Sequence, residues 1–482
     1  MPRLPGLLAL LVLAACSTRN PAYVHGDAAP DHGVTPDRGV LLDHGPDGPL
    51  MRDLPWQPPP PDTGPPPLDP ETYYFPANVK KDLDILFVVD NSNSMAEEQK
   101  ALAGAFPQFV DMLATMSGGM PNVHIGVISS DLGAGNYGLP SCEVPGGDGG
   151  KLQSQPKAAG CMPPNGAFIT YINGVTNVPG AGSALDRVKS GFSCIAEIGT
   201  GGCGFEQTIE SSRRALDPAL GTNPGFVRPA AMLAVVYLTD EDDCSAQKPQ
   251  LYDPTQSNLT DPLGPLTSFR CFEFGIQCDI NDRTVVGPRT GCVPAYDWLY
   301  KVGDYVTFFK ALKPPGQLVM AALAGPDQPV AVGKDAYNPA LQPSCQSNQG
   351  KAVPAIRFKT LLDAFGTASF FSSICAQDYG PALKQLGTLL AAQLGGACLQ
   401  QLKDTDPSQP GLQASCVVDD QLGGVSTPIP ACSAQTGPCG PCPCWRVVPD
   451  SKCGALSGYA LQVARNSPAA SGTIVRARCQ GP

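Results

Sequence analysis

The stretch from Leu83 to Ser94, LDILFVVDNSNS, decides the fold because it joins a short apolar run to a polar turn. The run from Leu83 to Val89 is rich in large apolar and β-branched residues, which is typical of a strand buried on both faces of a sheet. Asp90, Ser92 and Ser94 follow it directly. A strand covered on both faces belongs to a parallel sheet with helices on each side, so this stretch predicts an α/β fold.

Similar apolar runs recur along the chain, with helical patterns between them. The further strand candidates are 122–128, 232–238, 317–323 and 368–371. The helical candidates are 102–113, 209–216, 298–312, 358–365 and 383–394. Pro107 should kink the first of these helices or end its first segment. Strands that alternate with helices predict a doubly wound, mostly parallel, Rossmann-like sheet.

Two long segments interrupt this alternation within a folded body predicted at 81–396. They lie near 132–190 and 243–296, and they are rich in Gly, Pro, Cys and Asn. Loops of this length inside a compact domain usually have a function or internal cross-links. The cysteine pairs that would supply such cross-links are Cys142 with Cys161, and Cys271 with Cys278 or Cys292.

The amino terminus predicts export. Residues 1–15 combine Arg3 with a short apolar run, the pattern of a signal peptide, and small residues precede Cys16. Leu13-Ala14-Ala15-Cys16 resembles the bacterial lipobox, whose cysteine is diacylated. The alternative is an ordinary cleaved signal. Residues 16–80 are rich in Pro, Asp and Gly and predict a disordered tether, so the expected location is the bacterial cell envelope, lipid-anchored at Cys16.

The cysteine count agrees with an oxidising compartment. The chain has 19 cysteines, and 18 remain once Cys16 is set aside, so a disulfide framework is expected. Eight of them fall between Cys398 and Cys479. Residues 397–482 therefore predict a small cysteine-rich β module, with late strands at 459–464 and 473–477.

Two predicted strand ends carry hard oxygen donors. Asp90, Ser92 and Ser94 follow one strand, and Asp240 follows the strand at 232–238. Parallel strands bind ligands outside their carboxyl ends, and carboxylate and hydroxyl oxygens suit Mg²⁺, Mn²⁺ or Ca²⁺. On the first motif alone, Ser94 with Glu97 also fits a capping box that merely starts a helix. The second acidic strand end favours a cation site.

This pair of motifs resembles the von Willebrand factor type A domain and its metal-ion-dependent adhesion site. The resemblance spans about residues 82–394 and implies that Asp90, Ser92, Ser94 and Asp240 hold a divalent cation. It also implies a threonine from an intervening loop. By order along the chain this is Thr200, with Glu206 or Thr208 as alternatives. The family commonly has Gly where Glu241 stands here.

The same resemblance implies a binding role. In that family the cation keeps an open coordination position, which an acidic side chain of a protein partner fills. The expected function is therefore lipid-anchored binding of a protein partner through a divalent cation, in adhesion or envelope assembly. The alternative is a structural envelope protein that uses the fold without metal.

Composition argues against other classes. Lys and Arg number 32 against 43 Asp and Glu, so nucleic acid is an unsuitable partner. Three of the four histidines lie in the predicted tether, which leaves only His124 as a histidine base in the folded body, so no enzyme is expected. Cys439-Gly440-Pro441-Cys442 matches a thioredoxin-type tetrapeptide, but its surroundings favour a structural disulfide. Membrane contact is expected through the lipid alone.

Overall fold

The computed structural model describes most of the chain beyond residue 70. Described are residues 71–77, 82–115, 119–157, 160–348 and 350–395, and the stretch 399–481 apart from 400–401, 409–411, 433–441, 450–452, 454–457, 468 and 471. The predicted signal peptide, Cys16, most of the tether and Cys439 lie outside these residues. None of the described helices is both long and apolar enough to cross a membrane.

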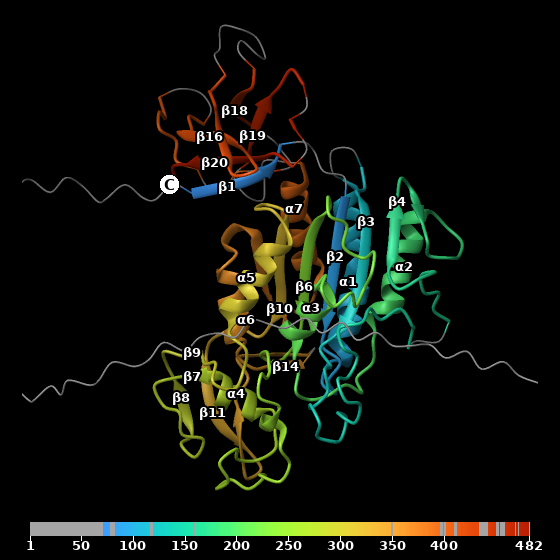
Figure 1. Cartoon of the computed structure of the whole chain (residues 1–482), viewed down its shortest axis with the longest axis vertical. Helices are drawn as coiled ribbons and strands as arrows, with labels where there is room; N and C mark the ends of the chain where they lie inside the picture. Colours follow the sequence, from blue (N-terminus) through green and yellow to red (C-terminus); the bar gives the residue numbers. More distant parts are fainter. Residues whose placement is uncertain are drawn as a thin grey trace, which may run out of the picture. The chain divides into compact units, whose positions relative to one another are not determined.

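The centre of the fold is a mixed seven-stranded sheet with the order β15-β10-β6-β2-β3-β4-β5 (Figure 1). Its strands are β2 (Asp82–Val89), β3 (Asn122–Ser129), β4 (Ile169–Ile172), β5 (Val175–Thr176), β6 (Met232–Leu238), β10 (Leu318–Ala324) and β15 (Ser369–Ser373). The five strands predicted from apolar runs pair in parallel. β4 and β5 add an antiparallel edge, which comes from within the segment predicted as an interruption.

Side chains of β2 alternate between two hydrophobic clusters, as expected for a strand buried on both faces. Ile85 and Phe87 belong to one cluster, and Leu86 and Val88 belong to the other. The helices of the first cluster are α1 (Ala96–Ala114), α2 (Ala184–Ala196) and α7 (Gly380–Gly395). Those of the second are α3 (Thr208–Leu216), α5 (Val302–Leu312) and α6 (Ile356–Asp363). The sheet therefore shares the first cluster with α1, α2 and α7, and it shares the second with α3, α5 and α6.

Helix α1 continues through Pro107, so the proline does not end the first segment, which was one of the two predicted outcomes. The helix is assigned without interruption from Ala96 to Ala114. A proline ring removes the hydrogen bond that the carbonyl four residues earlier would accept. Here that carbonyl belongs to Ala103, and it accepts a hydrogen bond from the Ser193 hydroxyl of α2 at 3.3 Å. A neighbouring helix thus satisfies the group that Pro107 leaves open.

The disulfides confirm an extensive framework, although the predicted pairs were wrong. Every cysteine that the structure describes is disulfide-bonded. The pairs in and around the two interruptions are Cys142–Cys203, Cys161–Cys194, Cys244–Cys271 and Cys278–Cys292. In the first interruption both partners lie in or after α2, far along the chain. Spacing within a loop cannot reveal such partners because the fold brings them together.

A lobe of short elements forms from the second interruption and from the segment between β10 and α6. A three-stranded sheet has the order β12-β11-β8, and two strand pairs are β13-β14 and β7-β9. The elements are α4 (Phe269–Gly275), β7 (Ile276–Gln277), β8 (Gly287–Arg289), β9 (Val293–Pro294), β11 (Val330–Asp335), β12 (Asn338–Leu341), β13 (Cys345–Ser347) and β14 (Gly350–Ala352). The segment between β10 and α6 was not predicted to form strands.

The carboxyl-terminal part forms a separate four-stranded sheet with the order β1-β20-β16-β17, together with the hairpin β18-β19. The strands are β1 (Glu71–Pro76), β16 (Cys416–Leu422), β17 (Val425–Ile429), β18 (Cys444–Pro449), β19 (Tyr459–Ala464) and β20 (Ile474–Cys479). Both predicted late strands are present. β1 lies in the stretch predicted as tether up to residue 80, so ordered structure begins earlier than expected.

Candidate metal centre

Three parallel strands end beside one another at the edge of the central sheet. The amide of Asp90, directly after β2, donates to the carbonyl of Leu238 at the end of β6 (2.9 Å). The amide of Ser130, directly after β3, donates to the carbonyl of Val89 (3.2 Å). Asp90, Ser130 and Asp240 therefore leave the sheet at neighbouring points, as parallel pairing of β2 with β3 and β6 requires.

Asp90 is fully buried and held on both carboxylate oxygens. Oδ1 accepts hydrogen bonds from the Ser92 amide (2.8 Å) and the Ser130 hydroxyl (3.4 Å). Oδ2 accepts one from the Thr239 hydroxyl (2.7 Å). Burial raises the pKa of Asp90 although these donors oppose the shift. The side chain is thus fixed in position, and its charge has no basic partner among these contacts.

The two motif serines and Asp240 lie together. The hydroxyl oxygens of Ser92 and Ser94 are 3.2 Å apart, and a hydrogen bond from Ser94 lowers the pKa of Asp240. The structure therefore gathers Asp90, Ser92, Ser94 and Asp240 at one place. Ser94 does not cap α1, since residue 95 holds the cap position and makes no side-chain cap bond. The capping alternative for Ser94 is therefore wrong.

Asp240 is a buried carboxylate with one oxygen left unsatisfied. It is 6% exposed, and its Oδ1 is buried without a hydrogen-bond partner. Burial, followed by the charges of Asp90 and Glu241, raises the pKa of Asp240 to about 8. A buried polar atom without a partner carries a free-energy cost, and two buried like charges repel. A divalent cation would remove both penalties, so the donor set fits one.

The middle ligand was predicted at Thr200, in the loop before α3. This loop does reach the site, because the Gly202 amide donates to the Asn91 carbonyl (2.8 Å) and Gln99 bridges the carbonyls of Asp90 and Gly199. The Thr200 side chain makes no hydrogen bond to any described residue. Thr200 remains a prediction, and the alternatives now have more support.

Those alternatives, Glu206 and Thr208, are both buried, and each has a side-chain oxygen without a partner, Oε2 and Oγ1 respectively. Burial raises the pKa of Glu206 well above its ordinary value, and the charges of Glu241, Asp90 and Asp240 raise it further. This mutual effect places the Glu206 carboxyl among the acidic groups of the site. Thr208 is the first residue of α3, two residues along the chain.

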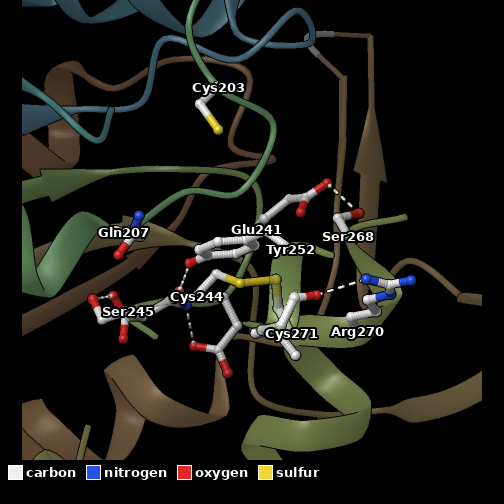
Figure 2. Close-up of a disulfide and its surroundings, with 12 residues drawn as sticks. Cys203, Gln207, Glu241, Cys244, Ser245, Tyr252, Ser268, Arg270 and Cys271 are labelled. Atoms are coloured by element: carbon white, nitrogen blue, oxygen red, sulfur yellow. Dashed lines mark hydrogen bonds between the residues drawn. A yellow bond between two sulfur atoms is a disulfide. The ribbon is translucent and has the colours of Figure 1, made fainter. Parts of the chain in front are cut away.

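Glu241 adds another acidic group, on the side of the lobe (Figure 2). The Ser268 hydroxyl donates to its Oε1 at 3.4 Å. Burial raises the pKa of Glu241 to about 7, the charge of Asp90 adds to the shift, and Lys351 partly offsets it. The Cys244–Cys271 disulfide then ties the loop after β6 to α4. The Cys244 amide also donates to the Glu206 carbonyl (2.8 Å), so this loop supports two acidic residues.

Sequence reasoning missed Ser130, Thr239 and Gln99, which orient Asp90. Thr239 directly follows the predicted strand 232–238 and Ser130 lies two residues after the predicted strand 122–128, so the rule that pointed to Asp90 would also have pointed to them. Gln99 lies on α1 and reaches the site only through packing. Among the described residues, no three His, Cys, Asp or Glu side chains form a group that could hold a metal ion. The candidate set differs in kind, since two of its members are serine hydroxyls.

Comparison with known proteins gives only remote likenesses. No family model and no curated protein matches the chain. Among solved structures, proximal thread matrix protein 1 of the mussel byssus has a TM-score of 0.30 and 11% identity, covering 66% of this chain and 50% of its own. A von Willebrand factor type A protein of Catenulispora acidiphila has a TM-score of 0.28 and 10% identity, covering 86% and 66%.

The pilus adhesin RrgA of Streptococcus pneumoniae gives similar values, with a TM-score of 0.28, 10% identity, and coverage of 86% of this chain and 58% of its own. The chain thus spans between half and two thirds of the length of these structures. Similarity at this level does not place the chain in a family. The structure itself shows a mixed α/β fold that is cross-linked by disulfides, with a buried cluster of acidic and hydroxyl side chains at one edge of the sheet.

Proposed function

We propose that the chain binds a divalent cation through Asp90, Ser92, Ser94 and Asp240, and that this cation binds an acidic side chain of a protein partner. The observation that carries the proposal is the burial of Asp90 and Asp240 beside two hydroxyls, with Oδ1 of Asp240 lacking a partner. Hard oxygen donors suit Mg²⁺, Mn²⁺ or Ca²⁺, and such cations keep exchangeable water positions. The cation would supply a positive charge for a carboxylate.

The finer identity belongs to the same proposal. The arrangement supports a von Willebrand factor type A domain with a metal-ion-dependent adhesion site, in a doubly wound fold. A lipid on Cys16 would hold the protein in a bacterial envelope, for adhesion or assembly. Such a role uses the cation to bind and needs no catalysis. Nucleic acid is not a proposed partner, since the net charge of −11 would repel it.

The test is a titration of the chelator-treated chain with Mg²⁺, Mn²⁺ and Ca²⁺, followed by calorimetry and by thermal unfolding. We expect saturable binding and a raised Tm, because a ligand that binds only the folded state stabilises it. Asp90→Ala should abolish both effects, whereas Asp304→Asn, an exposed carboxylate on α5, should leave them unchanged. If the wild type binds no divalent cation, the structural alternative without metal is favoured; if Asp90→Ala binds as tightly, the proposed site is wrong.

A further inference from the structure

A pocket of about 270 Å³ opens beside the candidate metal centre, and no role has yet been given to it. It is lined by the lobe, with α4 on one side and β12 and β14 on the other. Its apolar walls include Phe269, Phe272, Leu341 and Val353. A volume of this size is below the range of about 300–1,000 Å³ typical of small-molecule pockets, so it suits a side chain.

The pocket and the metal centre share one piece of chain. Glu241, which lines the pocket, directly follows the candidate ligand Asp240. The amide of Val353, another lining residue, donates to the Asp240 carbonyl (2.9 Å). The pocket lining is therefore joined to Asp240 both along the chain and by a backbone hydrogen bond.

The charged residues that line the pocket are mixed. Glu241, Asp242 and Asp335 are acidic, and Lys351 is the only base among the described lining residues. Lys351 and Asp335 are exposed, and Lys351 acts electrostatically on Glu241. The lining therefore carries no net positive charge, so the apolar walls, and not the charges, define the group that the pocket would accept.

We propose that the partner is a protein segment in which an apolar side chain stands next to the metal-binding carboxylate and enters this pocket. The inference rests on the proposed function and specifies the sequence class of the partner. The carboxylate would bind the cation, and the neighbouring apolar side chain would cover Phe272 and Leu341. Each methylene removed from water should tighten binding about fourfold.

The test uses fluorescently labelled, blocked tetrapeptides of sequence Gly-Asp-X-Gly and Gly-X-Asp-Gly, where X is Gly, Leu or Phe. Fluorescence anisotropy with the full chain in Mg²⁺ gives their dissociation constants. In at least one order, Leu or Phe should bind at least about tenfold more tightly than Gly, in proportion to the apolar area buried. Chelation of the cation should abolish binding of every peptide.

Two variants assign the preference to the pocket. Leu341→Asn should remove the advantage of Leu over Gly while the Gly peptide and the cation bind as before; intact cation binding also reports that this variant is folded. Val286→Asn is the matched control, because Val286 is an apolar residue of the same lobe, 54% exposed, that does not line the pocket. It should change nothing.

The outcomes separate this inference from the proposed function. Equal binding of Leu and Gly peptides, or a preference that survives Leu341→Asn, overturns the pocket assignment while leaving the cation site intact. Binding of the cation without binding of any peptide also overturns it. A chain that binds no cation in the calorimetric titration overturns the proposed function, and the pocket assignment with it.

Discussion

At the scale of single residues, the candidate site brings together acidic groups whose negative charges repel one another when no cation is bound. Asp90 and Asp240 are both buried, and the charge of Asp90 raises the pKa of Asp240. Burial of like charges destabilises a fold unless a counter-charge is supplied. Under the proposed function, the cation-free site costs stability that the bound cation restores, and this cost can be measured one residue at a time.

Asp240→Asn separates the destabilisation by the buried charge from the stabilisation by a bound cation. The amide has nearly the same shape but no charge, so the chelator-treated variant should unfold at a higher temperature than the chelator-treated wild type. The same change should remove the rise in Tm that Mg²⁺ produces. For the wild type, the underlying stabilisation free energy is about 2.7 kcal/mol at a concentration of 100 times Kd. Calorimetric unfolding with and without Mg²⁺ checks both. A variant that is less stable without cation and still responds to Mg²⁺ would contradict this account.

The stability of the cation-free protein should also depend on pH through Asp240 and Glu241. Their pKa values of about 8 and about 7 in the folded chain lie above the ordinary values of 3.8 and 4.5. The folded state then holds more protons, so the stability these groups contribute is present below about pH 4 and is lost as pH rises towards 8. The Tm difference between Asp240→Asn and wild type, both in chelator, should therefore widen from pH 5 to pH 8. A constant difference would mean that Asp240 titrates normally.

The middle ligand shows what sequence order alone leaves undecided. That Asp90, Ser92, Ser94 and Asp240 lie close together was predictable, because all four lie in turns that follow strands with a strong apolar pattern. The loop before α3 has no such anchor, and only packing reveals which of its side chains lacks a partner. Thr208→Val should weaken cation binding by tenfold or more, whereas Thr200→Val should leave it unchanged. Calorimetric titration of the two variants decides between them, and the reverse result would restore Thr200.

At the scale of elements, the disulfides hold the loops that carry the site. Cys244–Cys271 joins residues 27 apart and anchors the loop after β6 to α4. Replacing both cysteines by Ala should cost roughly 3 kcal/mol of unfolding free energy and weaken cation binding, because the Cys244 backbone supports Glu206. The matched control is the Cys278–Cys292 pair, 14 residues apart within the lobe. Its loss should reduce stability without changing cation affinity, and equal effects of the two pairs on affinity would refute the distinction.

The elements that sequence patterns predicted are those whose signal is local. β2, β3, β6, β10 and β15 are buried runs whose composition alone marks them as strands. β4, β5 and the lobe strands are short, and several of them pair with segments distant along the chain, as β4 does with β3 and β8 with β11. The continuity of α1 through Pro107 likewise depends on a hydroxyl from α2. Disulfide partners follow the same rule, since proximity in space decides them.

At the scale of the whole molecule, the carboxyl-terminal sheet is completed by a strand from the other end of the described chain. β1 pairs with β20 along its full length, from Glu71 with Cys479 to Pro76 with Ile474. No local pattern in a Pro-rich stretch predicts such a pairing. Because β1 precedes the central sheet along the chain and β20 follows it, the two ends of the described chain meet in one sheet.

This pairing makes the carboxyl-terminal sheet sensitive to a residue far away in sequence. Phe75 of β1 is 6% exposed and packs with Val418 and Val475 in one cluster. Phe75→Ala should cost about 3–5 kcal/mol, the usual range for deleting a buried ring. Without β1, the amides of β20 that bond to it should exchange hydrogen for deuterium faster, while those of β2 and β6 keep their protection. Thr72→Ala, at a partly exposed position of the same strand, is the control. Unchanged exchange in β20 of the Phe75→Ala protein would show that the sheet stands without its first strand.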